Sequence, residues 1–115
     1  MSFTELFKHG LDKFNPRIEK EDKIREILEE YDGRDITVKV KGDTAYVFHL
    51  SPKEVILDIS PQNLPDDIYL ETSMEILQKM LDKKRVDISD VLHGRIKWRN
   101  VGRREISLIK QVLTS

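Results

Sequence analysis

The chain has 115 residues, of which 38% are hydrophobic and 36% are charged, and its formal net charge is −1. A chain of this length is typical of one domain that buries roughly two thirds of its unfolded surface, so we expect a single core across residues 1–115. It contains no cysteine, which excludes disulfide bonds, a thiol nucleophile and thiolate metal ligands.

Two helices are predicted within residues 1–33. Ser2 and Glu5 have the spacing of a capping box, and apolar residues recur at helical intervals after them. Asn15 and Pro16 then favour a new start, because Asn caps a helix well and Pro suits the first helical position. The second helix is expected to end at Gly33, and its apolar face consists of Ile24, Ile27, Leu28 and Tyr31.

A β-hairpin is predicted next. Residues 35–40 alternate apolar and polar side chains, and Gly42 and Asp43 can form the turn. The second strand, 44–50, allows two registers that differ in which side chains share the apolar face of the first strand. The alternatives are Ala45, Val47 and His49 with a two-residue loop, or Tyr46 and Phe48 with a three-residue loop.

The remaining elements follow in the order strand, strand, helix, helical turn, strand and helix. Residues 54–60 and 68–70 are predicted strands, and the simplest arrangement of the first four strands is an antiparallel meander. Thr72 and Glu75 form a second capping box at the start of a helix. A fifth strand is predicted at 95–99, and the last helix at 103–113.

The fifth strand carries the clearest sign of a charged partner. Its alternation places Arg95, Lys97 and Arg99 on one face and Ile96 and Trp98 on the other. The basic face is either a solvated outer surface or a contact for anionic lipid headgroups, acyl-carrier phosphates or nucleic acid. With one Trp and no second interleaved aromatic, nucleic acid is the least favoured of these partners.

Charge also differs between the two parts of the chain. Residues 1–70 contain 15 Asp or Glu and 10 Lys or Arg, whereas residues 71–115 contain 6 and 10. The imbalance allows a basic face, but opposite charges can equally interleave once the chain folds. No stretch approaches the roughly 18 apolar residues of a membrane span, and the first residues lack a signal-peptide pattern, so we expect a cytoplasmic location.

The order of segments from residue 67 to residue 99 resembles the sterol carrier protein type two family. The pieces are a strand that begins with Asp67, two helices at 72–83 and 87–93, and a Gly-basic-apolar-basic strand from Gly94. Asn100 stands where a glycine often follows that strand. The resemblance covers about residues 34–113 and implies an α+β fold with a five-stranded, mainly antiparallel sheet. It also implies helices packed on one side and an apolar tunnel that takes up fatty acyl chains, sterols or similar lipids.

The apolar helix stripes are therefore open to two interpretations, plain core packing or the lining of a lipid cavity under the last helix. We take the second as the leading hypothesis, because a lipid site needs mainly apolar area. The expected lining residues are Phe48, Leu77, Met80, Leu81, Leu92, Trp98, Ile106, Ile109 and Leu113. The alternative is a protein-interaction or dimerisation module that has kept the fold and filled the cavity.

No catalytic apparatus, metal site or cofactor is predicted. His9, His49 and His93 lie in separate elements without metal-ligand spacing, and neither a nucleophile elbow nor a phosphate loop is present. The closest pairs of carboxylates, Asp66 with Asp67 and Asp87 with Asp90, lie beside turns or helix starts, where Asp favours capping. We therefore expect a non-enzymatic protein whose partner is a lipid, with transient anionic membrane contact and a homodimer as further hypotheses.

Overall fold

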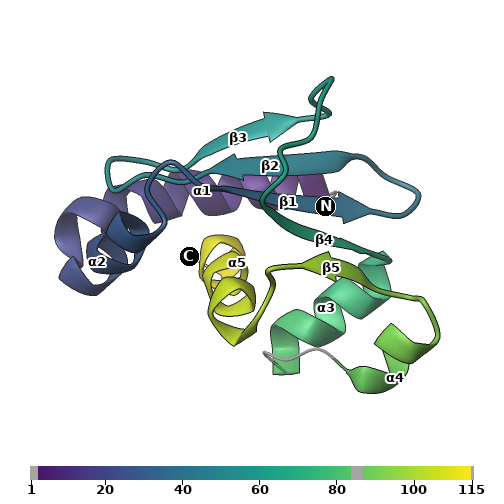
Figure 1. Ribbon diagram of the computed structural model, residues 1–115. Helices are drawn as coiled ribbons and strands as arrows, with labels where there is room; N and C mark the ends of the chain where they lie inside the picture. Colours follow the sequence, from purple (N-terminus) through teal and green to yellow (C-terminus); the bar gives the residue numbers. More distant parts are fainter. Residues whose placement is uncertain (1–2, 84–86, 115) are drawn as a thin grey trace.

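The computed structural model describes residues 3–83 and 87–114, so the capping residue predicted at position 2 lies outside the described part (Figure 1). These described residues form five helices and five strands. In order they are α1 (Phe3–Lys20), α2 (Asp22–Glu30), β1 (Asp35–Val40), β2 (Ala45–His49), β3 (Ile56–Ile59), β4 (Ile68–Thr72), α3 (Met74–Lys83), α4 (Ile88–Leu92), β5 (Lys97–Arg99) and α5 (Arg103–Thr114).

The five strands form one sheet in the order β3-β2-β1-β4-β5. Three neighbouring pairs are antiparallel, and β1 with β4 is parallel. The predicted α+β class and mainly antiparallel sheet are confirmed, but the simple meander is wrong. The chain leaves the edge strand β3, crosses β2 and β1, and enters on the far side of β1 (Figure 1). Asp67 fixes this entry, because its carboxylate accepts hydrogen bonds from Arg34 at 2.8 Å and from the Asp35 N–H at 3.0 Å.

The hairpin adopts the three-residue loop. Val38 lies opposite Tyr46 and Ile36 opposite Phe48, so both aromatic side chains of β2 join the apolar face of β1. The N–H of Val40 bonds to the carbonyl of Thr44 at 3.2 Å, which leaves residues 41–43 in the turn. Gly42 has φ +81°, a left-handed conformation that glycine adopts without steric cost.

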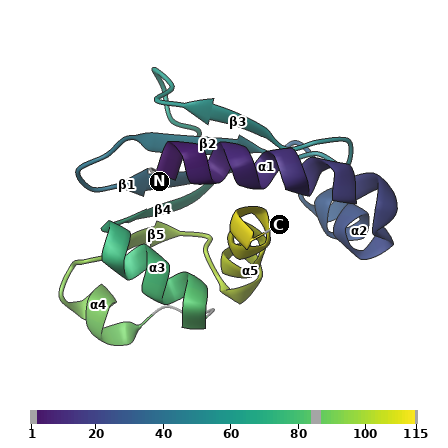
Figure 2. The same ribbon diagram turned by 180° about the vertical axis from the view of Figure 1, so that it is seen from behind.

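All five helices lie on one side of the sheet or beyond its β5 edge, and α1 crosses the covered face lengthwise (Figure 2). Phe7 is fully buried there and meets the rings of Tyr46 and Phe48 edge to face, with centroids 4.8 and 5.1 Å apart. Further buried residues of α1 recur at helical spacing: Leu11, Phe14 and Ile18. The N-terminal helix is thus an integral wall of the core.

The predicted helix start at Asn15 and Pro16 is wrong, because α1 continues through both residues to Lys20. The side chain of Asn15 is engaged elsewhere: it accepts from the Val55 N–H at 2.8 Å and donates to the Val55 carbonyl at 3.1 Å. This pair of bonds anchors the segment before β3 to α1. The helix ends instead beside Glu21, which forms an ion pair with Arg17 at 2.6 Å.

The start of α3 also differs from the prediction. Ser73 caps the helix through a hydrogen bond from the Ile76 N–H to its hydroxyl at 3.3 Å. Thr72, the predicted cap, ends β4 and donates to the carbonyl of Arg95 at 3.0 Å. Asn100, after β5, has φ +58°, the conformation that would favour glycine at this position. The chain then enters α5, which lies beside α1 and α3 in both views (Figures 1 and 2).

Candidate functional site

An apolar notch lies between α5 and the sheet. Its lining contains no polar side chain, and its volume is about 10 Å³. That space corresponds to about one water molecule, so this notch is much smaller than the open tunnel that the resemblance implied. The lining residues are Ile36, Phe48, Leu50, Val55, Leu108, Ile109 and Val112.

The predicted lipid-lining residues fall into four groups. Phe48 and Ile109 line the notch. Leu77, Met80 and Ile106 are buried in the core without lining it, whereas Leu92 is 80% exposed and Trp98 45% exposed. The side chains of Leu81 and Leu113 lie outside the described residues. A ligand-binding role for all of these predicted lining residues stays a prediction.

Sequence reasoning missed Leu108 on α5. Its side chain is buried and lines the notch, next to the predicted apolar face of α5, which includes Ile106, Ile109 and Val112. The helix is buried over a wide arc because it packs against α1 and α3 as well as approaching the strands. The sequence signal was the pair of adjacent apolar residues at positions 108–109. A narrow apolar stripe uses residues three or four apart, so two adjacent apolar residues indicate a wider buried face.

The start of α5 is held by Glu105. Its Oε1 accepts a hydrogen bond from the Gly102 N–H at 2.6 Å, as the acidic residue of a capping box does. Its other carboxylate oxygen accepts from the hydroxyl of Tyr31 at the end of α2. Burial, followed by the bond to Glu105, raises the pKa of Tyr31 to about 12. The hydroxyl therefore remains a donor across the physiological pH range.

A second depression lies between α2 and α5 and has a volume of about 270 Å³. Leu108 lines both this groove and the apolar notch, so the two share a wall. Arg104 forms an ion pair with Glu30, and its guanidinium lies 5.7 Å from the ring centroid of Tyr31. The lining of the α2–α5 groove consists of Ile27, Arg103, Arg104, Ser107, Leu108 and Gln111.

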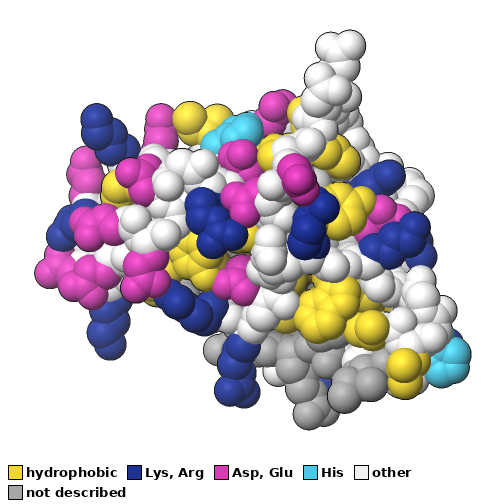
Figure 3. Space-filling model, in the orientation of Figure 1, with side chains coloured by type: hydrophobic (Ala, Val, Ile, Leu, Met, Phe, Trp, Pro, Cys, Tyr) yellow, Lys and Arg dark blue, Asp and Glu magenta, His cyan; other side chains and the backbone are white. Residues whose placement is uncertain are grey.

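The basic side chains predicted for the fifth strand are exposed but have acidic neighbours, and Arg95 precedes the strand because β5 begins at Lys97. Arg99 forms an ion pair with Asp66 at 2.8 Å, and Arg95 with Asp90 at 3.1 Å. Lys97 lies opposite Glu71 in the sheet. On the sheet face seen in Figure 3, dark blue and magenta side chains lie side by side, which is the interleaved arrangement. A headgroup role for Arg95, Lys97 and Arg99 stays a prediction.

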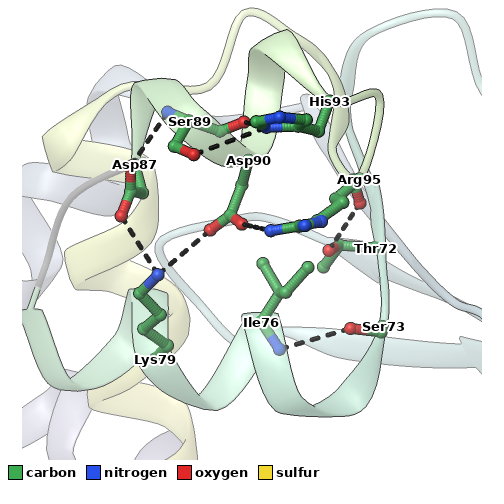
Figure 4. Close-up of polar contacts among 9 residues, drawn as sticks. All are labelled: Thr72, Ser73, Ile76, Lys79, Asp87, Ser89, Asp90, His93 and Arg95. Atoms are coloured by element: carbon green, nitrogen blue, oxygen red, sulfur yellow. Dashed lines mark hydrogen bonds and ion pairs between the residues drawn. The ribbon is translucent and has the colours of Figure 1, made fainter.

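A polar cluster joins α3, α4 and the segment before β5 (Figure 4). Asp90 is almost fully buried and accepts from Lys79 at 3.3 Å and from Arg95 at 3.1 Å. Asp87 caps α4 through the Ser89 N–H at 2.9 Å, and its bond with Lys79 holds the pKa of Asp87 below its ordinary value. The capping role expected of the neighbouring carboxylates therefore holds for Asp87 but not for Asp90, which joins elements instead.

The histidines do not meet. Within residues 3–83 and 87–114, no group of three or more His, Asp or Glu side chains could hold a metal ion. His49 Nδ1 lies 2.5 Å from Asp35 on the outer sheet face, and His93 Nδ1 lies 2.7 Å from the Ser89 carbonyl. Among the described helices, none is long and apolar enough to span a bilayer.

Comparison with known proteins supports the fold. No family model matches the chain, and no curated protein matches it. A solved structure described as "UbiJ-SCP2 Ubiquinone synthesis protein" is similar with a TM-score of 0.63, over 98% of this chain and 94% of that one, at 16% sequence identity. The likeness is thus one of fold and includes the two N-terminal helices. The chain has the sterol carrier protein type two fold, as the order of its segments predicted.

Proposed function

We propose that the protein binds an apolar ligand, such as a lipid or a fatty acyl chain, between α5 and the sheet. The observation that supports this most directly is the uninterrupted apolar lining of the notch beside Leu108, Ile109 and Val112. A site for an oily chain needs apolar area and few polar groups. The similar solved structure carries an SCP2 label and a description that names ubiquinone synthesis, which agrees with a lipid-related role.

Binding in this site requires α5 to move, because a notch of about 10 Å³ does not hold an acyl chain. Burial of each methylene group contributes about 0.8 kcal/mol, so ten groups contribute roughly 8 kcal/mol. That is comparable with the whole stability of a small domain, about 5–15 kcal/mol, and is enough to offset displacement of one helix. α5 packs mainly on α1 and less on α3, so its boundary with the strands is the natural place to open.

The test is a titration of the purified protein with a fluorescent long-chain fatty acid. We expect saturable binding at micromolar protein. Val112→Phe fills the notch and is expected to weaken binding at least tenfold, whereas Leu64→Phe, in an exposed loop, is expected to leave it unchanged. Circular dichroism checks that both variants are folded. Absence of saturable binding to the unmodified protein would reject the proposal.

A second candidate is a protein-interaction or dimerisation module. It is favoured by the nearly filled interior together with the exposed apolar side chains of Met74, Leu92 and Trp98. Sedimentation velocity over a hundredfold concentration range separates the two candidates, because only the module should self-associate without lipid. Both candidates are binding functions, and we propose no catalytic step for either.

A further inference from the structure

We propose that the groove between α2 and α5 holds the anionic head of a single-chain carboxylate amphiphile whose tail occupies the notch under α5. The inference rests on the proposed lipid-binding function and adds to it a charge requirement and a second subsite. It assigns the head to the start of α5 and not to the basic face of β5.

The two depressions share one lining residue. Leu108 belongs both to the lining of the apolar notch and to the lining of the α2–α5 groove, so the two lie next to each other. Arg103, Ser107 and Gln111 recur every four residues and therefore follow one stripe of α5 along the groove. An acyl chain that extended from the notch past Leu108 would therefore leave a purely apolar lining and meet the polar side chains of the groove. Such a transition suits a molecule with an oily tail and a polar head.

The positive charge of Arg103 and Arg104 in the groove favours a head group with a negative charge. Arg103 is exposed and has no ion pair or hydrogen bond among residues 3–83 and 87–114. Arg104 is already paired with Glu30 and lies over the Tyr31 ring, so it is held in place at the rim. A carboxylate in the groove would pair with Arg103 first and gain the field of Arg104.

The apolar part of the groove strengthens that pair. Ile27 and Leu108 contribute apolar side chains to the same lining as Arg103 and Arg104. A carboxylate placed against this surface loses part of its contact with water, which lowers the local dielectric constant and strengthens its attraction to Arg103. Ser107 adds a hydroxyl that can donate to the same carboxylate.

The basic residues at and before β5 are less suited to this role. Arg95 is bound to the buried Asp90, and Arg99 to Asp66 and to the carbonyl of Asp67. An anion at Arg95 or Arg99 would have to displace these partners, and an anion at Lys97 would lie near the carboxylate of Glu71, which is opposite Lys97 in the sheet. At Arg103 it displaces only water.

The experiment compares a fluorescent long-chain fatty acid with its methyl ester on the full chain at low ionic strength. We expect the acid to bind about tenfold more tightly than the ester, the difference expected of one charge-assisted hydrogen bond. Arg103→Gln should reduce the affinity for the acid to that for the ester and leave the ester unchanged. Added salt should weaken binding of the acid only. Lys53→Gln, in an exposed loop, is the matched control and should change neither affinity.

The possible outcomes distinguish failure of lipid binding from failure of the anionic subsite. If neither probe binds saturably, the proposed function itself fails. If both probes bind the unmodified protein equally, lipid binding stands and the anionic subsite is rejected. If Arg99→Gln, rather than Arg103→Gln, removes the preference for the acid, the head lies at β5 and the inference is overturned. Because Arg103 is exposed, its replacement is not expected to unfold the protein, and circular dichroism checks this.

Discussion

The hydroxyl of Tyr31 donates a hydrogen bond to Glu105, 74 positions later in the chain, and so joins the end of α2 to the first turn of α5. The same carboxylate accepts from the Gly102 N–H, which makes Glu105 both the cap of α5 and its tie to the N-terminal helices. Glu105 therefore links α2 to α5, the helix that contributes lining residues to both the notch and the groove.

Tyr31→Phe removes the hydroxyl and retains the ring. Loss of a hydrogen bond to a charged acceptor is expected to lower the free energy of unfolding by about 1.5 kcal/mol, measured by urea denaturation at pH 8. The pKa of Tyr31 is raised to about 12 in the fold from an ordinary 10.0. Its contribution is therefore present in full below pH 10 and is lost as pH rises through about 12. An equal difference between the two proteins at pH 8 and pH 12 would contradict this assignment.

Asp67→Asn tests the entry of β4 and has the opposite pH dependence. The hydrogen bond from Arg34 is the main cause that holds the pKa of Asp67 below its ordinary 3.8. The stabilisation is therefore present above pH 3.8 and is lost as pH falls through the lower folded value. We expect the variant to be less stable by about 1 kcal/mol at pH 7 and equal to the wild type near pH 2. Asp12→Asn, on the exposed face of α1, should show no such convergence.

Phe7→Ala tests whether α1 belongs to the core. The side chain is fully buried between α1 and β2, where it contacts Tyr46 and Phe48. Its truncation is expected to cost about 3–5 kcal/mol in denaturant unfolding, because it removes buried area and leaves a cavity. Leu64→Ala, at an exposed position, should cost less than about 0.5 kcal/mol. Similar small losses for both variants would show that α1 is only loosely attached.

Thr37→Val is predicted to stabilise the protein. Within the described residues, the Thr37 hydroxyl is buried and has no hydrogen-bond partner. An unsatisfied buried hydroxyl costs about 1–3 kcal/mol, and valine has nearly the same shape, so we expect a gain of about 1 kcal/mol in thermal or urea unfolding. Thr44→Val is the control, because the Thr44 hydroxyl bonds to that of Ser60 and its loss should give no gain. A loss of stability in Thr37→Val would reveal a partner for the hydroxyl.

The elements of the sheet were largely predictable, but their pairing was not. Alternation located β1, β2 and β5, and the helical spacing located α3 and α5. The hairpin register stayed open because β2 has apolar side chains on both faces, and Val47 is as deeply buried as Phe48. The packing of Phe7 against Tyr46 and Phe48 marks the face of β2 that the helices cover.

The candidate site was predictable only in part. Phe48 and Ile109 line the notch as expected, whereas Leu92 and Trp98 are exposed. Periodicity assigns one face of a helix to the interior, but it does not state how many neighbours surround that helix. Because α5 packs against α1 and α3 and also approaches the strands, Leu108 is buried in addition to the predicted apolar face.

The amino-acid sequence by itself determined the α+β class and the order of the elements, because backbone periodicity, turn residues and caps are local properties. That order of segments carried the resemblance to the sterol carrier protein type two family. Tertiary structure alone decided that β4 inserts beside β1, that α1 continues through Pro16 and that the space under α5 is nearly closed. Those features depend on contacts between residues far apart in the chain, such as Asn15 with Val55 and Tyr31 with Glu105. Local sequence patterns do not specify which residues far apart in the chain come into contact.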